Sequence, residues 1–248
     1  MNELEDELKR TQTELEHLKQ AHQDFIYTIS HDMEASLRTI SGFIQVIKEE
    51  QKDHFNEEAK VCFDFIVKSV EKSKATLEGL RTLSRLTTRA EPFSTFECGD
   101  LLKEVQTSLA PLIDSKKAQI KISNLPKITA DRQQIALAFF HILQNALTYK
   151  EENKPPHISI TTKEKDNRWE FCIQDNGIGI PDHMIEEIFK PLKRAVGDQY
   201  PGIGMGLPIV RKVLQRHSGD IKIEKIKEGG TSAHFYLAKD VKETTINT

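Results

Sequence analysis

One histidine lies in a segment whose residue types favour nucleophilic chemistry. Residues 27–37 read YTISHDMEASL, and helical spacing groups His31 with Ala35 and Arg38, away from the apolar stripe that passes through Met33. The His31 side chain is therefore expected to point to solvent. An exposed neutral imidazole nitrogen is a competent nucleophile for a γ-phosphate, although a histidine alone on a helix is more often surface decoration. The chemistry depends on whether the chain also binds a phosphate donor.

Three glycine-rich motifs in the second half of the sequence could approach such a donor. DNGIGI (175–180) follows a predicted strand, GIGMGL (202–207) leads into a predicted helix, and EGGTSAHF (228–235) lies in a predicted hairpin. Glycines let the backbone come close to phosphates, and a helix that starts after Gly206 offers free N–H groups to an anion. Each motif alone is common turn chemistry. Neither of the first two has the GxGxxG spacing or βαβ setting of a Rossmann site.

Two long helices must position the histidine. A heptad stripe typical of a two-stranded coiled coil opens the chain, and it contains Leu4, Leu8, Thr11, Leu15, Leu18, His22, Phe25 and Ile29. It continues to Ile47 after a stutter that falls across His31. The helical pattern breaks at QKDHFN (51–56), and a second helix follows. Two antiparallel helices cannot bury both stripes, so we expect a homodimeric four-helix bundle; a monomeric hairpin packed on the rest of the chain is the alternative.

The remainder of the chain mixes strands and helices. After a break at residues 88–100, helices are predicted at 101–117, 131–150 and 207–217, and strands at 118–123, 125–130, 157–175 and 219–238, the last two as hairpins. This order predicts an α+β two-layer sandwich, with helices on one face of the sheet. The expected domains are a coiled-coil segment (1–23), a helical hairpin (24–90), the sandwich (91–240) and a loose tail (241–248).

The composition excludes several classes of function. The net charge is only −3 and basic residues are scattered, so nucleic-acid binding is not expected. No apolar run approaches the length that spans a bilayer, and no signal peptide opens the chain. Cys62, Cys98 and Cys172 have no metal-ligand spacing and read as small hydrophobes in a reducing compartment. We therefore expect a cytoplasmic protein with no direct membrane insertion and no structural metal.

The motifs in combination resemble a known family. QNALTYK (144–150), then D-x-G-x-G, then G-x-G-x-G resembles the Bergerat ATP-binding fold of histidine kinases, type II topoisomerases, mismatch-repair ATPases and heat-shock chaperones. With SHDMEASL upstream, residues 24–238 resemble the core of a bacterial sensor histidine kinase, with the closest likeness to the phytochrome-like branch. IFKPLKR (188–194) matches the phenylalanine-centred box of that family, and YPGIGMGLPIVRKVLQRHSG looks like its lid end and following helix.

The resemblance implies roles for individual residues. His31 would be the catalytic phosphoacceptor, and Asp32 would accept the imidazole N–H proton, although a solvated helix acid is the alternative for Asp32. The amide oxygen of Asn145 would bind Mg²⁺, a hard cation that bridges phosphates. Asp175 would accept from the adenine amino group. The other implied nucleotide-binding residues are Tyr149, Gly177, Gly179, Lys193, Arg194, Gly202, Gly204, Gly206 and Leu207.

Several side chains of this unit also have a purely structural interpretation. Lys193 and Arg194 could touch phosphates or form a mobile solvated pair, and Tyr149 could line the pocket or belong to the core. Phe189 would anchor the lid or dock on the helical bundle. Trp169, in an alternating strand, is interpreted as packing.

The family also implies an activity and partners. The chain would be a homodimeric, ATP- and Mg²⁺-dependent autokinase that phosphorylates His31 and passes the phosphoryl group to an aspartate of a response-regulator receiver domain. Its input would come from an upstream sensory domain through the coiled coil. A degenerate kinase that acts as a receiver-docking relay is the runner-up. A topoisomerase or chaperone ATPase shares the nucleotide fold but does not explain His31.

Four positions depart from the family pattern. Ala35 stands where a Thr or Asn commonly orients water for dephosphorylation, which argues against phosphatase activity, and Ser36 replaces a helix-bending proline. His141 replaces an amide, and Thr148 replaces a lysine expected to meet phosphate; Lys150 is the candidate to compensate. Weak nucleotide affinity or slow phosphorylation is the expected consequence.

Overall fold

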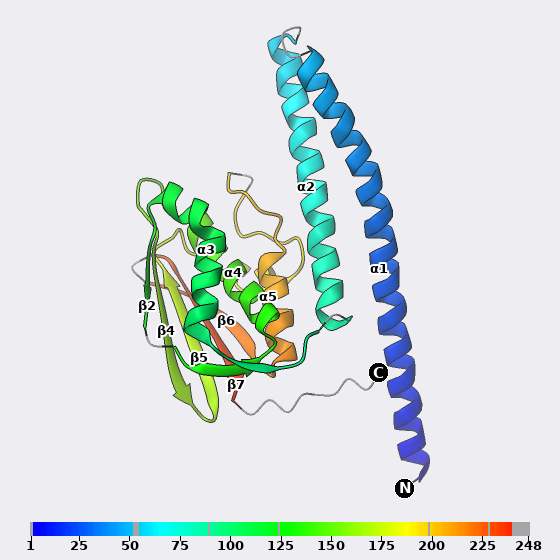
Figure 1. The fold of residues 1–248 in the computed structure, drawn as a ribbon, viewed down its shortest axis with the longest axis vertical. Helices are drawn as coiled ribbons and strands as arrows, with labels where there is room; N and C mark the ends of the chain where they lie inside the picture. The colour runs from blue at the N-terminus through cyan, green and yellow to red at the C-terminus, as the bar shows by residue number, and fades with distance from the viewer. Residues whose placement is uncertain are drawn as a thin grey trace. The chain divides into compact units, whose positions relative to one another are not determined.

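The computed structural model describes residues 2–51, 55–88, 90–123, 125–197, 199–227 and 229–239. The chain divides into two compact units, Met1–Thr88 and Arg89–Thr248, which are described separately below (Figure 1). The boundary falls two residues before the one expected after residue 90. The tail predicted to be loose, 241–248, lies outside the described residues.

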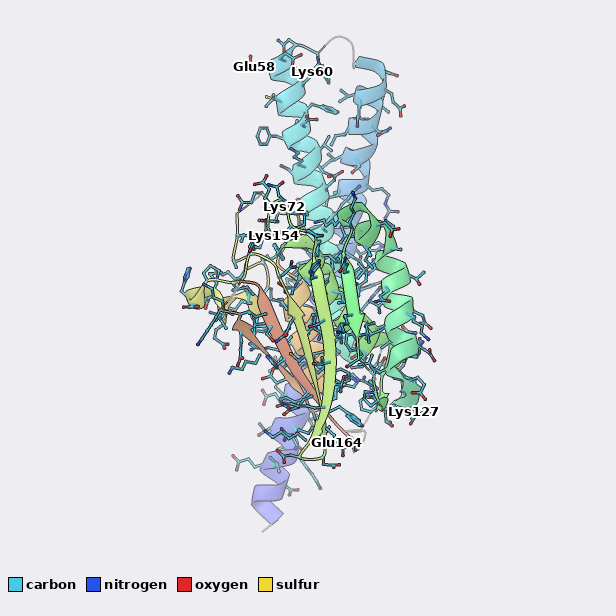
Figure 2. All side chains as sticks on the ribbon, turned by 90° about the vertical axis from the view of Figure 1, so that its left-hand side faces the viewer. Glu58, Lys60, Lys72, Lys127, Lys154 and Glu164 are labelled. Atoms are coloured by element: carbon cyan, nitrogen blue, oxygen red, sulfur yellow. The ribbon has the colours of Figure 1, made fainter. Side chains whose placement is uncertain are left out.

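The first unit is a hairpin of two antiparallel helices, α1 (Asn2–Gln51) and α2 (Glu57–Thr88). Asn56 caps α2, because its side-chain oxygen accepts from the backbone N–H of Ala59 at 2.8 Å. Figure 2 shows Glu58 and Lys60 at this end of α2. Acidic residues in the first turn, Glu57 and Glu58, also favour the helix N-terminus.

The helix α1 is continuous through His31 and through residues 23 and 24. No break in the helix therefore marks the expected division between a coiled-coil segment and the hairpin. Most of the described stripe residues are exposed within one copy of the chain, including Leu8, Leu15, Leu18 and Phe25. The side chains of two stripe members, Leu4 and His22, lie outside the described part of the chain.

The second unit is built on a five-stranded mixed sheet in the order β2-β4-β5-β7-β6. The strands are β2 (Gln119–Ile122), β4 (His157–Lys165), β5 (Arg168–Asp175), β7 (Thr231–Ala238) and β6 (Asp220–Lys225). Only the β2–β4 pair is parallel. Figure 1 shows α3 (Cys98–Lys116), α4 (Arg132–Thr148) and α5 (Gly206–Arg216) on one face of this sheet. The predicted α+β two-layer sandwich is confirmed.

Aromatic side chains join the helix layer to the sheet. Phe171 of β5 and Phe235 of β7 stack with their ring centroids 4.8 Å apart, and Phe139 of α4 meets both rings edge-on at 5.6 and 5.4 Å. All three rings are at most 2% exposed. Figure 2 labels Glu164 near the turn from β4 to β5, on the rim of the sheet, where Lys239 approaches it at 2.6 Å.

A strand was missed in the segment read as a break. Residues Ser94–Glu97 form β1, which pairs antiparallel with β3 (Lys127–Ala130) in a separate two-stranded sheet. Its paired residues lie 30 to 36 positions away in the sequence, so local periodicity could not reveal it. The helix after it begins at Cys98 rather than 101. The predicted N-cap is confirmed, since the Asp131 side chain accepts from the N–H of Gln134 at 3.1 Å.

Two short 3₁₀ turns, η2 (Asp182–Met184) and η3 (Glu187–Phe189), lie in the segment between the two main glycine motifs. Of the three cysteines, Cys98 is buried as expected of a small hydrophobe, whereas Cys62 is exposed. Among the described residues, no helix combines the length and the apolar character needed to cross a bilayer.

Candidate functional site

Asp175 is the last residue of β5 and lies at the centre of the candidate nucleotide site. Its Oδ1 accepts from the backbone N–H of Gly177 at 2.8 Å and from that of Thr231 at 3.1 Å. Burial raises the pKa of Asp175 above its usual value, and the two N–H donors oppose that rise. Both donors use one carboxylate oxygen, which orients the group. A fixed carboxylate of this kind can accept from a ligand amino group.

Glycines bring three backbone segments close to Asp175. A Cβ on Gly177 would lie 2.3 Å from the carbonyl oxygen of Tyr149, and a Cβ on Gly230 would lie 1.9 Å from that of Asp175. Gly230 also has φ +97°, which favours glycine. Gly177 was expected here, whereas Gly230 was not named as a site residue. The pair of glycines in EGGTSAHF was the signal for it.

The end of α4 is tied to the same loop. Asn145 is half-buried in the last turn of α4, and its carbonyl accepts from the N–H of Tyr149 at 2.9 Å. The carbonyl of Tyr149 in turn accepts from the N–H of Ile178 at 3.0 Å. The structure therefore brings together Asn145, Tyr149 and the DNGIG loop, as expected. The Tyr149 ring is half-buried and lies 5.5 Å from that of Tyr200.

The GIGMG motif forms a loop that leads directly into α5. Gly202 and Gly204 have φ +127° and +76°, and a Cβ on Gly204 would lie 2.4 Å from the carbonyl oxygen of Lys193. The N–H of Leu192 donates to the Gly204 carbonyl at 3.0 Å. Gly206 is the first residue of α5, so the expected helix N-terminus is confirmed. Leu207, in the first turn, is half-buried.

Lys193 and Arg194, the two basic candidates between the glycine motifs, differ in their surroundings. Lys193 is exposed, whereas the Arg194 guanidinium donates to the carbonyl of Gly197 at 2.8 Å and to that of Tyr200. The Arg194 guanidinium therefore stabilises the conformation of its own loop through these two carbonyls. Phe189 is 6% exposed, and the Arg211 guanidinium of α5 lies 3.7 Å from its ring centroid. Phe189 therefore anchors the base of the segment within this unit.

Thr148 stands where the family pattern has a lysine, and Lys150 was the candidate to replace that lysine. Thr148 is 8% exposed, and the Lys150 ammonium donates to the Glu151 carbonyl at 3.1 Å. The Lys150 ammonium, which was expected to replace the missing lysine, is thus hydrogen-bonded to the next residue of the chain. Burial and, after it, the positive charge of Lys150 lower the pKa of Lys116.

His141 was not among the predicted site residues, yet it contacts the end of the GIGMG loop. A Cβ on Gly206 would lie 3.3 Å from the His141 Nδ1, so the imidazole packs directly on the first residue of α5. Burial lowers the pKa of His141 to about 4, against a hydrogen bond with Gln144 that favours the charged form. The imidazole at this helix N-terminus is therefore neutral at physiological pH.

The half-buried His141 predicts acid sensitivity of the second unit. Unfolded histidine titrates near 6.5, so as pH falls from 6.5 towards 4 the unfolded state gains a proton that the folded state does not. At pH 5 the folded state should have lost about 2 kcal/mol relative to pH 7.5 through this group. Urea unfolding followed by fluorescence of Trp169, the one tryptophan of the chain, measures this loss. His141→Asn should abolish that part of the pH dependence; an equal loss in both proteins would contradict the assignment.

The candidate phosphoacceptor lies in the first unit. The His31 side chain is 68% exposed, and its Nδ1 lies 3.3 Å from the Oδ1 of the neighbouring Asp32. A carboxylate at this nitrogen favours the tautomer with Nδ1–H and leaves Nε2 with its lone pair. Glu34, interpreted from the sequence as surface charge, is half-buried and meets Arg81 of α2 at 3.2 Å.

The second unit fits a magnesium nucleotide. Glycines occupy positions where a Cβ would collide with neighbouring atoms, the half-buried Asp175 carboxylate could accept from an amino group, and the half-buried Asn145 offers an amide oxygen. The described residues contain no group of three or more His, Cys, Asp or Glu side chains that could hold a metal ion alone.

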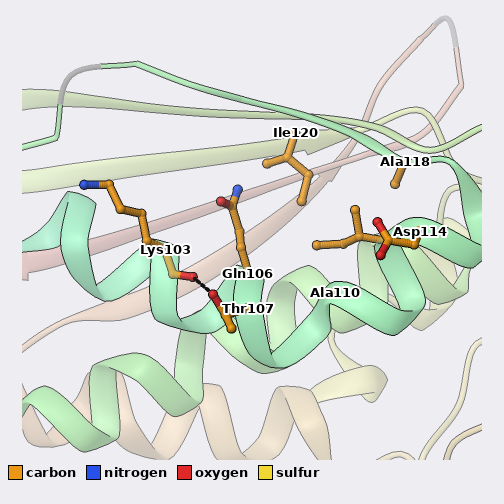
Figure 3. A pocket seen from close by; sticks show the side chains of 8 residues that line it. Lys103, Gln106, Thr107, Ala110, Asp114, Ala118 and Ile120 are labelled. Carbon is orange, nitrogen blue, oxygen red and sulfur yellow. Dashed lines mark hydrogen bonds between the residues drawn. The ribbon is translucent and has the colours of Figure 1, made fainter.

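A groove elsewhere in this unit is separate from these residues. It has a volume of about 510 Å³ and lies between α3 and the edge strand β2, with Ala110, Ile113 and Ile120 among its apolar lining and Lys103 at one end (Figure 3). None of the predicted nucleotide-binding residues lines it.

Comparisons with known proteins identify the fold and its relatives. Residues 130–241 match the model of the histidine kinase-, DNA gyrase B-, and HSP90-like ATPase family. The catalytic domain of histidine kinase ThkA is similar, with 26% identity and a TM-score of 0.53 over 60% of this chain and 97% of that domain. Over its second unit the chain is therefore similar to the catalytic domains of sensor histidine kinases.

The expected likeness to the phytochrome-like branch is confirmed among the relatives of this chain. The phytochrome-like protein Cph1 of Synechocystis sp. is 27% identical over 233 residues, which are 94% of this chain and 31% of Cph1. The chain thus spans about a third of that relative. A solved complex of ThkA with response regulator protein TrrA shares the fold, with a TM-score of 0.61, 20% identity and coverage of 90% of this chain and 64% of that chain.

Proposed function

We propose that this kinase core is an ATP-dependent histidine autokinase that phosphorylates His31. The observation that carries the proposal is the presence in one chain of a glycine-lined site around Asp175 and an exposed imidazole whose Nδ1 lies 3.3 Å from Asp32. Positioning and charge neutralisation account for most of the catalysis of phosphoryl transfer. The chain would supply both.

The transfer step follows from these contacts. The Nε2 lone pair of His31 attacks the γ-phosphorus, the bond from that phosphorus to the bridging oxygen breaks, and ADP leaves with the electron pair. Asp32 accepts the Nδ1 proton and so neutralises the imidazole. Asn145 would hold Mg²⁺, which neutralises phosphate charge when bound. Asp175 would orient the adenine, and the free N–H groups of α5 would face the phosphates.

We propose a homodimer for the helical hairpin. Large apolar side chains remain exposed along both helices within one copy, namely Ile29, Met33, Ile40, Phe43 and Ile47 of α1 and Val61, Phe65 and Ile66 of α2. A face of this extent on a monomer is an interaction site, and a second copy would bury it as a four-helix bundle. Sedimentation should give twice the 28.3 kDa chain mass at micromolar concentration. A mass of one chain would contradict the dimer.

We further propose that phosphorylated His31 passes its phosphoryl group to an aspartate of a receiver domain, with input from an upstream sensory domain through the N-terminal part of α1. The solved complex of ThkA with a response regulator, which shares the fold, supports a receiver as partner. Ala35 is exposed and has no polar side-chain atom to orient water. The chain should therefore phosphorylate a receiver but leave it phosphorylated.

The degenerate relay scaffold remains the second candidate, because Thr148 is buried and Lys150 bonds to the Glu151 carbonyl. Incubation with γ-labelled ATP and Mg²⁺ separates the two. The autokinase should acquire a covalent label that survives alkali and is lost in acid, and it should bind Mg·ATP by calorimetry. A chain that neither labels nor binds nucleotide would contradict the proposed function and favour the scaffold.

A further inference from the structure

Side-chain contacts fix the segment before β1 to the second unit. Glu91, Pro92 and Phe93 lie between the end of α2 at Thr88 and the start of β1 at Ser94. We propose that Phe93, Asp131, Arg216 and His217, here called the linker anchor, fix this segment to the ATP-binding unit and so set the rate of phosphoryl transfer to His31. The inference rests on the proposed autokinase function.

The ion pair of the linker anchor, Asp131 with Arg216, binds the backbone of Glu91. Asp131 is 1% exposed, and its Oδ2 accepts from the Glu91 N–H at 2.9 Å and pairs with Arg216 Nη1 at 3.0 Å. The other guanidinium nitrogen, Nη2, donates to the Glu91 carbonyl at 3.1 Å. Gln133 adds a bond to the Glu91 carboxylate at 2.6 Å. Both backbone polar groups of Glu91 are thus held by one ion pair.

The aromatic part holds Phe93. Its ring stacks on His217 with centroids 4.8 Å apart and planes 10° from parallel, and the Arg216 guanidinium lies 4.8 Å from the Phe93 centroid. His217 is fully buried, and its Nδ1 donates to the Val213 carbonyl at 2.7 Å while its Nε2 accepts from the Asp131 N–H at 3.0 Å. The imidazole is therefore a neutral, fixed platform for the ring.

The linker anchor shortens the free connection between the units. With residues 91–93 held, three Cα–Cα steps lead from the end of α2 at Thr88 to Glu91, a reach of at most about 10 Å. Without these contacts, six such steps lead from Thr88 to Ser94, the first residue of β1. Effective concentration falls roughly as the −3/2 power of tether length, so doubling the tether should slow transfer about threefold.

Nucleotide binding should not change on release. Asp131 and Arg216 lie at the N-terminus of α4 and the C-terminus of α5, whereas Asn145 and Gly206 lie at the opposite ends of these helices. The linker anchor thus acts as a positioning device rather than as part of the nucleotide site.

The test compares two matched double variants of the full chain. Phe93→Ala/Arg216→Lys keeps a positive charge for the buried Asp131 but removes the stacking and the second guanidinium contact with Glu91. Phe96→Ala/Arg132→Lys is the control, because Arg132 lies over the half-buried Phe96 at 5.8 Å without touching residues 91–93. Each protein is measured for hydrogen exchange of the Glu91 amide, Mg·ATP affinity by calorimetry and initial labelling rate of His31 at saturating ATP.

The expected result has three parts. The Phe93→Ala/Arg216→Lys protein should exchange the Glu91 amide faster, keep Mg·ATP affinity within about twofold and label His31 about threefold more slowly, while the control matches the wild type in all three. Unchanged exchange, an unchanged or faster labelling rate, or a parallel loss of nucleotide affinity would each overturn the linker anchor. A wild-type chain that does not label at all would instead refute the proposed function, since amide exchange and nucleotide affinity do not depend on transfer.

Discussion

Replacing His31 with Gln is expected to reduce covalent labelling by about a thousandfold or more, to background. Glutamine keeps a polar side chain at this exposed position of α1 but has no nitrogen lone pair able to attack phosphorus. The side chain is 68% exposed, and its one described polar partner is the adjacent Asp32. The substitution should therefore leave the helix and the second unit intact.

Labelling with γ-labelled ATP, quenched in alkali, measures this loss, and calorimetry should show Mg·ATP affinity within about twofold of wild type. His234→Gln is the matched control, because His234 is 43% exposed on the sheet of the second unit. That control should label normally. Full labelling of the His31→Gln protein would show that another residue accepts the phosphoryl group.

Replacing Asp175 with Asn is expected to weaken adenine-nucleotide binding about 10- to 150-fold, which corresponds to the loss of a charge-assisted hydrogen bond of roughly 1.5–3 kcal/mol. The amide oxygen of Asn can still accept from the N–H groups of Gly177 and Thr231. Its NH₂ group then takes the other position of the carboxylate, where it is a second donor facing the adenine amino donor. The loop should keep its shape while the ligand loses its acceptor.

Calorimetric titration with Mg·ATP measures this change, and thermal melting should show that the second unit remains folded. Asp182→Asn removes the same charge from an exposed position in η2 and should bind Mg·ATP like the wild type. Equal affinity of the Asp175→Asn protein and the wild type would place adenine recognition elsewhere.

The sequence predicted the elements that have strong local signals. The alternating strands of both hairpins, the Asp131 cap and the start of α5 after the glycine loop are local features, and each is confirmed. The turn at Asp175 was also foreseeable. An Asp side chain commonly accepts a hydrogen bond from the backbone N–H two residues further along the chain, here that of Gly177.

Features that depend on distant partners were not predictable in the same way. The strand Ser94–Glu97 exists through pairing with Lys127–Ala130, and Glu34 is half-buried only because Arg81 of α2 reaches it. The contact of His141 with Gly206 likewise joins α4 to α5. Nothing in the local sequence distinguishes these residues from ordinary loop or surface positions. The roles of the predicted site residues remain predictions that the experiments above test.

The proposed function requires that the second unit phosphorylates one nitrogen of one histidine, His31. After reaction with Mg·ATP, mass spectrometry under alkaline conditions can locate the phosphoryl group among the nine histidines, and ³¹P NMR can distinguish the two ring nitrogens. Because Nδ1 of His31 lies beside Asp32, we expect Nε2-phosphohistidine at residue 31. A phosphoryl group on another residue, or on Nδ1 of His31, would contradict it.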